Sequence, residues 1–196
     1  MSSQPKTLLT PEQYLEIERQ AESKSEFFEG EMFAMGEMFA MAGAGWTHNR
    51  IVANAVAQFS FLLRARPCQT TPSAMRVRVS ATGLFTYPDV VVVCGEPQFL
   101  DERRDTLLNP TLIVEVLSPS TEAYDRGRKF EHYRSLASLG EYVLVASDRI
   151  HVDWYTRQDS AQWLLTSASG SEEAIELKSV GCRLAISDLY EKVDFA

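Results

Sequence analysis

Tyr87–Cys94 reads YPDVVVVC and Asn109–Thr121 reads NPTLIVEVLSPST, and these two stretches determine the expected fold. Apolar runs of this length, bounded by Pro, Gly and polar residues, are typical of buried strands. Glu115 shares one strand face with Ile113 and Leu117. The opposite face is also apolar, so we expect this strand to be central in a sheet. An ionised, unpaired carboxylate there would cost several kcal/mol, so Glu115 requires a cation, a hydrogen-bond network or a proton.

Asp89 is the second acid of interest. If the two strands pair antiparallel with Cys94 near Thr111, Asp89 faces Val116 and lies next to Glu115; a register one residue different would place it opposite Glu115 itself. Two carboxylates that converge repel each other, raise a pKa or hold a divalent cation. Hard oxygen ligands with room for water suit Mg²⁺ or Mn²⁺. The alternative is that Asp89, which follows a proline, is only a turn residue at the entry of its strand.

A helix is expected after the second stretch, from Ser120 or Thr121 to about Ser135. Its residues Asp125, Lys129 and Tyr133 are four apart and share one face. Because the helix starts directly after the strand that bears Glu115, we expect Lys129 to reach that site as a charge-stabilising ammonium. The alternative is an ordinary Asp125–Lys129 helix pair worth about 0.3–0.5 kcal/mol. Further basic side chains give the helix a local surface suited to phosphates: Arg126, Arg128, His132 and Arg134.

The rest of the chain predicts a mixed α/β (α+β) domain without an interior linker. Thr10, Pro11 and Glu12 form a helix start, and this helix is expected to run to about Ser23. An extended segment then covers 26–41 and contains a tandem hexapeptide, GEMFAM, at 30–35 and 36–41. Its even length preserves the alternation of a strand, so we interpret it as an insertion that lengthens a hairpin. The remaining expected elements are a helix at 48–64, strands at 76–79, 141–146, 150–156, 162–166 and 174–177, and a last short helix from Ser187.

Composition bounds the class of protein. The chain has 196 residues, of which 45% are hydrophobic and 23% charged, as in a folded protein of one domain. A net charge of −8 argues against a protein that coats nucleic acid by bulk charge, but not against an enzyme with a local nucleic-acid contact. The three cysteines are widely spaced, which predicts buried thiols in a reducing compartment. No apolar stretch is long enough to span a bilayer, so we expect a cytoplasmic protein with no membrane partner.

Several of these residues together resemble a known family. The ordered series Pro88-Asp89, Glu115-Val116-Leu117, Ser118–Thr121, Asp125, Lys129, Tyr133 and Glu141-Tyr142 is similar to the Uma-type restriction endonuclease family, a bacterial branch of the PD-(D/E)XK nuclease superfamily. The likeness covers nearly the whole chain. It implies a restriction-endonuclease-like mixed central sheet flanked by helices, with a core at about 48–146, an additional N-terminal helix and hairpin, and a C-terminal β meander, all within one domain, 1–196.

The same resemblance implies a site. Asp89 and Glu115 match the motif acids, and Val116 would lend its backbone carbonyl to the metal. The usual lysine of the superfamily is replaced by Leu117, so Lys129 is the expected substitute. Supporting contacts are assigned to other polar residues: Asp125, His48, Glu31 and Glu29. Taken alone, His48 at a helix start is more often a cap or a packing residue.

The expected function is therefore endonuclease cleavage of DNA phosphodiester bonds with Mg²⁺ or Mn²⁺. Asp89 and Glu115 would hold the ion, and Lys129 would stabilise the attacking water or the phosphate oxygens. The partners that we consider are DNA and a second copy of the chain. The alternative is the same fold without catalysis, serving as a nucleic-acid or protein adaptor, and Leu117 motivates it. A third reading is a structural acidic network without a ligand.

Overall fold

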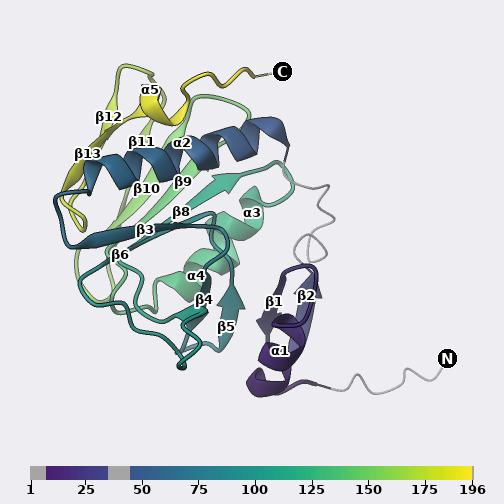
Figure 1. Cartoon of the computed structure of the whole chain (residues 1–196). Coiled ribbons are helices and arrows are strands. Elements are labelled where there is room, and N and C mark those ends of the chain that lie inside the picture. The colour runs from purple at the N-terminus through teal and green to yellow at the C-terminus, as the bar shows by residue number, and fades with distance from the viewer. Residues whose placement is uncertain (1–7, 35–44, 196) are drawn as a thin grey trace.

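A six-stranded mixed sheet forms the centre of the computed structural model, which describes residues 8–34 and 45–195 (Figure 1). The strand order is β11-β10-β9-β8-β6-β3, in which β8 and β9 are parallel and the other neighbours are antiparallel. Every residue of β8 is buried, as expected for a central strand. The strands are β3 (Cys68–Pro72), β6 (Val90–Cys94), β8 (Leu112–Leu117), β9 (Glu141–Ala146), β10 (Val152–Arg157) and β11 (Trp163–Ala168).

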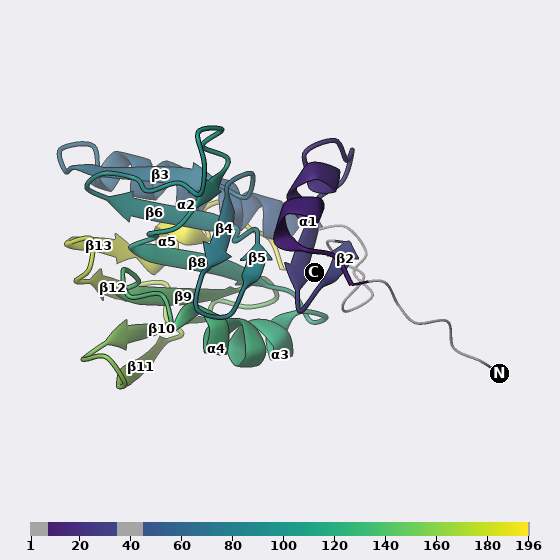
Figure 2. The ribbon, with the colours of Figure 1, turned by 90° about the horizontal axis from the view of Figure 1, so that it is seen from below.

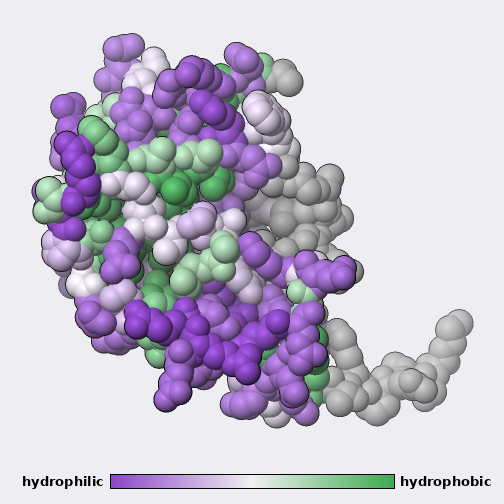
Figure 3. Space-filling model, viewed as in Figure 1, coloured by the Kyte–Doolittle hydropathy of each residue, from purple (hydrophilic) through white to green (hydrophobic). Residues whose placement is uncertain are grey.

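Helices cover both faces of this sheet, as the sequence predicts. On one face lie α2 (Trp46–Leu62) and α5 (Ile186–Leu189), and the buried side of α2 packs on the valines and leucines of β6 and β8. On the other face lie α3 (Glu122–Tyr124), a π-helical turn η1 (Asp125–Lys129) and α4 (Phe130–Tyr133) (Figure 2). In the view of Figure 3, apolar side chains gather around α2, within a largely hydrophilic surface.

A second sheet carries the N-terminal part of the chain. Its strand order is β2-β1-β5-β4-β7. A capping box of Thr10 and Gln13 starts α1, whose buried Tyr14 stacks on Phe27 of β1 with ring centroids 4.8 Å apart. The expected N-terminal helix and hairpin are thus present, although the helix ends before Ser23. The elements are α1 (Pro11–Glu18), β1 (Ser25–Phe28), β2 (Glu31–Ala34), β4 (Arg76–Val79), β5 (Leu84–Thr86) and β7 (Thr106–Leu107).

The C-terminal part contributes the expected meander and a small hairpin. Strands β9, β10 and β11 follow one another antiparallel and extend the central sheet instead of forming a separate layer. The hairpin of β12 (Ala174–Leu177) and β13 (Cys182–Ala185) packs in the same apolar cluster as α2 and α5. Sequence periodicity predicted β12 but missed its partner β13.

The hexapeptide repeat is only half described. In the first copy, Gly30 lies in the β1–β2 turn with φ of +84°, a backbone conformation that glycine adopts at low cost, and Glu31 to Ala34 form β2. The first copy is therefore part of a hairpin, as predicted. The second copy, 36–41, lies outside the described residues.

The helix expected from Ser120 or Thr121 to about Ser135 is broken into three short pieces. The π turn η1 interrupts it at Asp125–Lys129, and α4 ends at Tyr133. The prediction of one regular α-helix is therefore wrong in detail. A π turn inserts one extra residue into a turn, and here it leaves both Asp125 and Lys129 buried while Arg128 between them is exposed.

The cysteine prediction also requires a correction. Cys68 and Cys94 form a disulfide, because β3 and β6 pair with these two residues directly opposite each other. Their separation of 26 residues gave no sign of this cross-strand contact. Cys182 alone remains a free thiol, half-buried, and burial raises its pKa to about 11. No helix among residues 8–34 and 45–195 is long and apolar enough to cross a membrane.

Candidate metal and catalytic site

Asp89 and Glu115 lie on the same face of the central sheet. Continuing the β6–β8 register, in which Val90 faces Val114, places Asp89 opposite Glu115. Directly opposite residues of an antiparallel pair point to the same face. The expected register, with Asp89 opposite Val116, is therefore wrong by one residue. At the other end of this strand pair, Cys94 donates its backbone N–H to the Thr111 hydroxyl at 2.9 Å.

Glu115 is nearly fully buried, with an exposed fraction of 3%. Its Oε1 lies 2.9 Å from the Lys129 ammonium and accepts a hydrogen bond from the Tyr133 hydroxyl, also at 2.9 Å. Burial raises the pKa of Glu115; Lys129 opposes this shift and the carboxylates of Asp125 and Asp89 add to it, for a net pKa of about 8. The carboxyl therefore has a counter-ion and a hydrogen bond, yet still retains a proton well above its ordinary range.

Lys129 reaches the site from the helical segment, as the sequence predicts. Its ammonium lies 2.9 Å from Glu115, 3.4 Å from Asp125 and 3.8 Å from Glu26, so three buried carboxylates surround one cation. Burial alone would lower the pKa of Lys129, but these negative charges outweigh it and raise the pKa. Asp125 also has a raised pKa, caused first by burial. Three carboxyl groups therefore share one ammonium.

Asp89 stands at the more open end of this cluster. Its Oδ2 accepts the backbone N–H of Val116 at 2.8 Å, and His48 Nε2 lies 3.3 Å away. His48 belongs to the first turn of α2, and its Nδ1 is buried without a hydrogen-bond partner in the described structure. Burial lowers the pKa of His48, but the hydrogen bond and charge of Asp89 outweigh it, so the pKa is raised overall. The structure thus brings His48 to a motif acid instead of leaving it as a helix cap.

Glu26 is a site residue that sequence reasoning missed. It lies on β1, is 7% exposed, and accepts hydrogen bonds from the Thr86 hydroxyl and from Tyr124, the latter at 3.0 Å. The sequence did contain a signal for Glu26: it is an acid directly before two phenylalanines in a segment expected to be extended. Glu115 was singled out for the same reason, as an acid among apolar residues of a strand. The two acids chosen instead lie further along the same hairpin: Glu29 is exposed in the turn and Glu31 begins β2.

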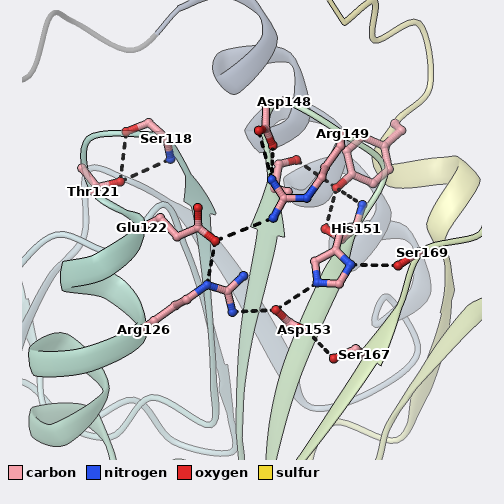
Figure 4. A network of polar contacts seen from close by, with 12 residues as sticks. Ser118, Thr121, Glu122, Arg126, Asp148, Arg149, His151, Asp153, Ser167 and Ser169 are labelled. Atoms are coloured by element: carbon pink, nitrogen blue, oxygen red, sulfur yellow. Dashed lines mark hydrogen bonds and ion pairs between the residues drawn. The ribbon is translucent and has the colours of Figure 1, made fainter.

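The three arginines predicted to contact nucleic acid differ in whether their side chains are already held in ion pairs. Figure 4 shows Arg126 between two carboxylates, with Nε 2.8 Å from Glu122 and Nη1 2.6 Å from Asp153. Asp153 is buried and lies 3.1 Å from His151 Nε2, so this network ties η1 to β10. Arg128 and Arg134 are exposed. Of the three predicted arginines, Arg126 is therefore already occupied by structural ion pairs.

The described residues contain no group of three or more Asp, Glu, His or Cys side chains arranged to hold a metal ion. Any ion at Asp89 and Glu115 would therefore have to complete its coordination with the Val116 carbonyl and water. Mg²⁺ commonly binds in this way, with one or two carboxylates and several retained waters. The donor set is compatible with Mg²⁺ or Mn²⁺, which prefer oxygen ligands.

The raised pKa of Glu115 leads to a prediction for the metal-free protein. The unfolded chain loses this proton near pH 4.5, whereas the folded chain keeps it to about pH 8, so over this range the unfolded state binds fewer protons. The contribution of Glu115 to the free energy of unfolding should therefore fall as pH rises, by at most about 1.4 kcal/mol per unit. Denaturant titrations of wild type and Glu115→Gln in EDTA, over this pH range, measure this contribution to the free energy of unfolding. The wild type should lose stability relative to the variant; parallel pH profiles would contradict the assignment.

Comparisons with known proteins identify the family and the fold of the chain. A family model described as "Putative restriction endonuclease", named Uma2, matches residues 11–187. Two uncharacterized proteins of Synechocystis are each 36% identical: slr1290 over 98% of this chain and 97% of its own length, and sll1609 over 86% and 92%. A crystal structure described as "a putative nuclease belonging to DUF820", from Anabaena variabilis, superposes with a TM-score of 0.72 at 19% identity and covers 95% of this chain and 98% of its own. The predicted nuclease-like α+β fold is confirmed.

Proposed function

The chain belongs to the Uma2 family of "Putative restriction endonuclease" proteins, and from this premise we propose that it is a metal-dependent endonuclease that hydrolyses DNA phosphodiester bonds. One observation carries the proposal. Asp89 and Glu115 share a sheet face, and Lys129 contacts Glu115 at 2.9 Å although position 117 is a leucine. The helical segment thus supplies the ammonium that the strand lacks.

The proposed ligands of the ion are the carboxylates of Asp89 and Glu115 and the backbone carbonyl of Val116. The three carboxyl groups around the Lys129 ammonium favour a divalent cation at the site, because a further positive charge relieves the repulsion between them. When bound, Mg²⁺ or Mn²⁺ would polarise the scissile phosphate and lower the pKa of a water molecule.

The residues of the chain have separate roles in this proposal. Lys129 donates hydrogen bonds to the phosphate oxygens on which negative charge develops. Asp125 and Glu26 hold the ammonium from the other sides, and the Tyr133 hydroxyl fixes the orientation of Glu115. Both Lys129 and Glu115 are buried, so their rotamers are set before substrate arrives, which reduces the reorganisation needed during the reaction.

The experiment that tests this function is a cleavage assay on supercoiled and linear DNA with Mg²⁺, Mn²⁺, Ca²⁺ or EDTA. Nicked or linear products are expected with Mg²⁺ or Mn²⁺ and none with EDTA. Cutting that continues in EDTA would exclude the metal mechanism. Absence of cutting under every ion would favour the alternative, a nuclease fold that binds nucleic acid or protein without cleavage, for which Leu117 is the supporting observation.

Arg126 and Arg128, two residues apart in η1, provide a prediction for DNA binding. Arg128→Ala should weaken binding and reduce the slope of log Kd against log salt by about 1, because an exposed guanidinium that meets a phosphate releases about one counter-ion. Arg126→Ala should instead lower the thermal midpoint, since it leaves buried Asp153 without its cation. Salt titrations and thermal melts of both variants measure this. An unchanged salt slope in Arg128→Ala would remove it from the DNA contact.

A further inference from the structure

An aromatic side chain beside the candidate site has no function in the chemistry described above. Trp46 is the first residue of α2 and is 84% exposed, the largest exposed fraction among the large hydrophobic side chains of the described residues. His48, in the same helical turn, contacts Asp89. Figure 1 shows α2 beginning near the end of β8, the strand that carries Glu115. The indole therefore stands at the edge of the candidate site.

The direction of the indole restricts what it could contact. Residues two apart on a helix point to nearly opposite sides, so Trp46 does not face Asp89 as His48 does. Arg50, four residues on, shares the side of Trp46. Its Nε donates to the backbone carbonyl of Glu191 at 3.5 Å, and no carboxylate of the described residues pairs with it. An exposed indole and a guanidinium that has no carboxylate partner within residues 8–34 and 45–195 thus lie one helical turn apart.

A cation lies on the same side of α2 as the indole. Of the five arginines in residues 45–88, Arg50 lies near the start of α2, whereas Arg64 and Arg66 follow its other end and Arg76 is buried and paired with Asp105. Asp89 contacts the first turn of α2 through its carboxylate, whereas Glu191 and Asp194 contact α2 through their backbone carbonyls and have exposed side chains. An aromatic ring next to a cation is the combination with which proteins bind a nucleic-acid strand, the ring for a base and the cation for the backbone.

We propose that Trp46 and Arg50 bind a nucleic-acid strand beside the candidate site, with the indole stacked on one unpaired base and the guanidinium on the backbone. The proposal rests on the proposed endonuclease function and makes it more specific. Because the ring faces away from Asp89, the stacked base is a neighbour of the scissile phosphate and not the reacting nucleotide. A base inside a duplex has no free face, so the substrate would be single-stranded or distorted next to the cut.

The test is a binding titration in EDTA, where no metal-dependent cleavage interferes, with a short oligothymidylate and a blunt duplex of the same length. Tryptophan emission and anisotropy of a labelled strand are both recorded. The wild type should bind the single strand more tightly, with quenching that disappears in Trp46→Phe. Trp46→Ala should raise Kd by about 5- to 150-fold, whereas Trp46→Phe, which retains a ring, should change it only a few-fold. Arg50→Gln should reduce the salt slope by about 1.

Phe61→Ala is the matched control, because Phe61 is a 60% exposed aromatic at the other end of α2. It should bind like the wild type. Wild-type affinity in Trp46→Ala would overturn the proposal, and a change of oligomeric state in that variant with unchanged DNA binding would assign the indole to contact with a second copy instead. Binding that depends on Trp46 without cleavage under any metal would contradict the endonuclease function alone. Cleavage that does not depend on Trp46 would contradict this inference alone.

Discussion

Glu115→Gln and Asp89→Asn are each expected to reduce metal-dependent DNA cleavage by about 10²- to 10³-fold or more. Either change removes one of the two carboxylates proposed to hold the ion, and the loss of a single charge-stabilising group at a reaction centre already costs this much. Single-turnover cleavage with Mg²⁺, at protein in excess over DNA, measures the effect without interference from product release.

The Glu115 variant should show that this loss is not caused by unfolding. Gln preserves the shape of the side chain and removes a buried carboxyl whose ionised form is unfavourable, so above about pH 8 the metal-free variant should be at least as stable as the wild type. Glu176→Gln is the matched control, because Glu176 is exposed and pairs only with Arg183 at the surface. Cleavage by Glu115→Gln at the rate of this control would remove Glu115 from the mechanism.

Lys129→Met is expected to have the second large effect, on both activity and stability. The substitution leaves the carboxyls of Glu115, Asp125 and Glu26 buried without their shared cation, which should lower the free energy of unfolding by about 3–5 kcal/mol at neutral pH. Cleavage should fall by about 10²- to 10³-fold through loss of the ammonium at the phosphate. Urea titration and single-turnover cleavage measure the two quantities separately.

Millimolar Mg²⁺ should recover part of the lost stability of Lys129→Met but not its activity, because the ion can replace the buried positive charge without supplying the hydrogen-bond donor. Lys192→Met is the matched control: Lys192 is exposed, pairs only with neighbouring Glu191, and should change stability by less than about 0.5 kcal/mol. Wild-type cleavage by Lys129→Met would show that Lys129 is only a structural counter-ion.

Two features of the sequence predicted part of the site: an acid within an apolar strand, and an acid and a lysine four residues apart in the segment that follows. Glu115 stands out because an acid in an all-apolar strand needs a partner, and the i, i+4 spacing of Asp125 and Lys129 offered one. The structure brings these residues together at 2.9 and 3.4 Å. The strands expected at 88–94 and 111–117 lie at Val90–Cys94 and Leu112–Leu117, because continuous Val, Ile and Leu runs leave little ambiguity.

The remainder depends on tertiary contacts that no local pattern encodes. The register of β6 and β8 places Asp89 one residue from its expected partner. The Cys68–Cys94 disulfide depends on the pairing of β3 with β6, and Glu26 reaches the site from a separate sheet. A π turn cannot be told from an α-helix by hydrophobic spacing over five residues. Local rules therefore found the acids of the central strands and the lysine of the following helical segment, and missed Glu26, which a separate sheet brings to Lys129.

Crystals soaked with Mn²⁺ test the central claim most directly, because anomalous scattering identifies this ion and its position. The account predicts one Mn²⁺ between the carboxylates of Asp89 and Glu115, with the Val116 carbonyl and water completing its shell, and no such peak in Glu115→Gln crystals. An anomalous map without a peak between these two acids, from crystals soaked at a Mn²⁺ concentration that supports cleavage in solution, would contradict it.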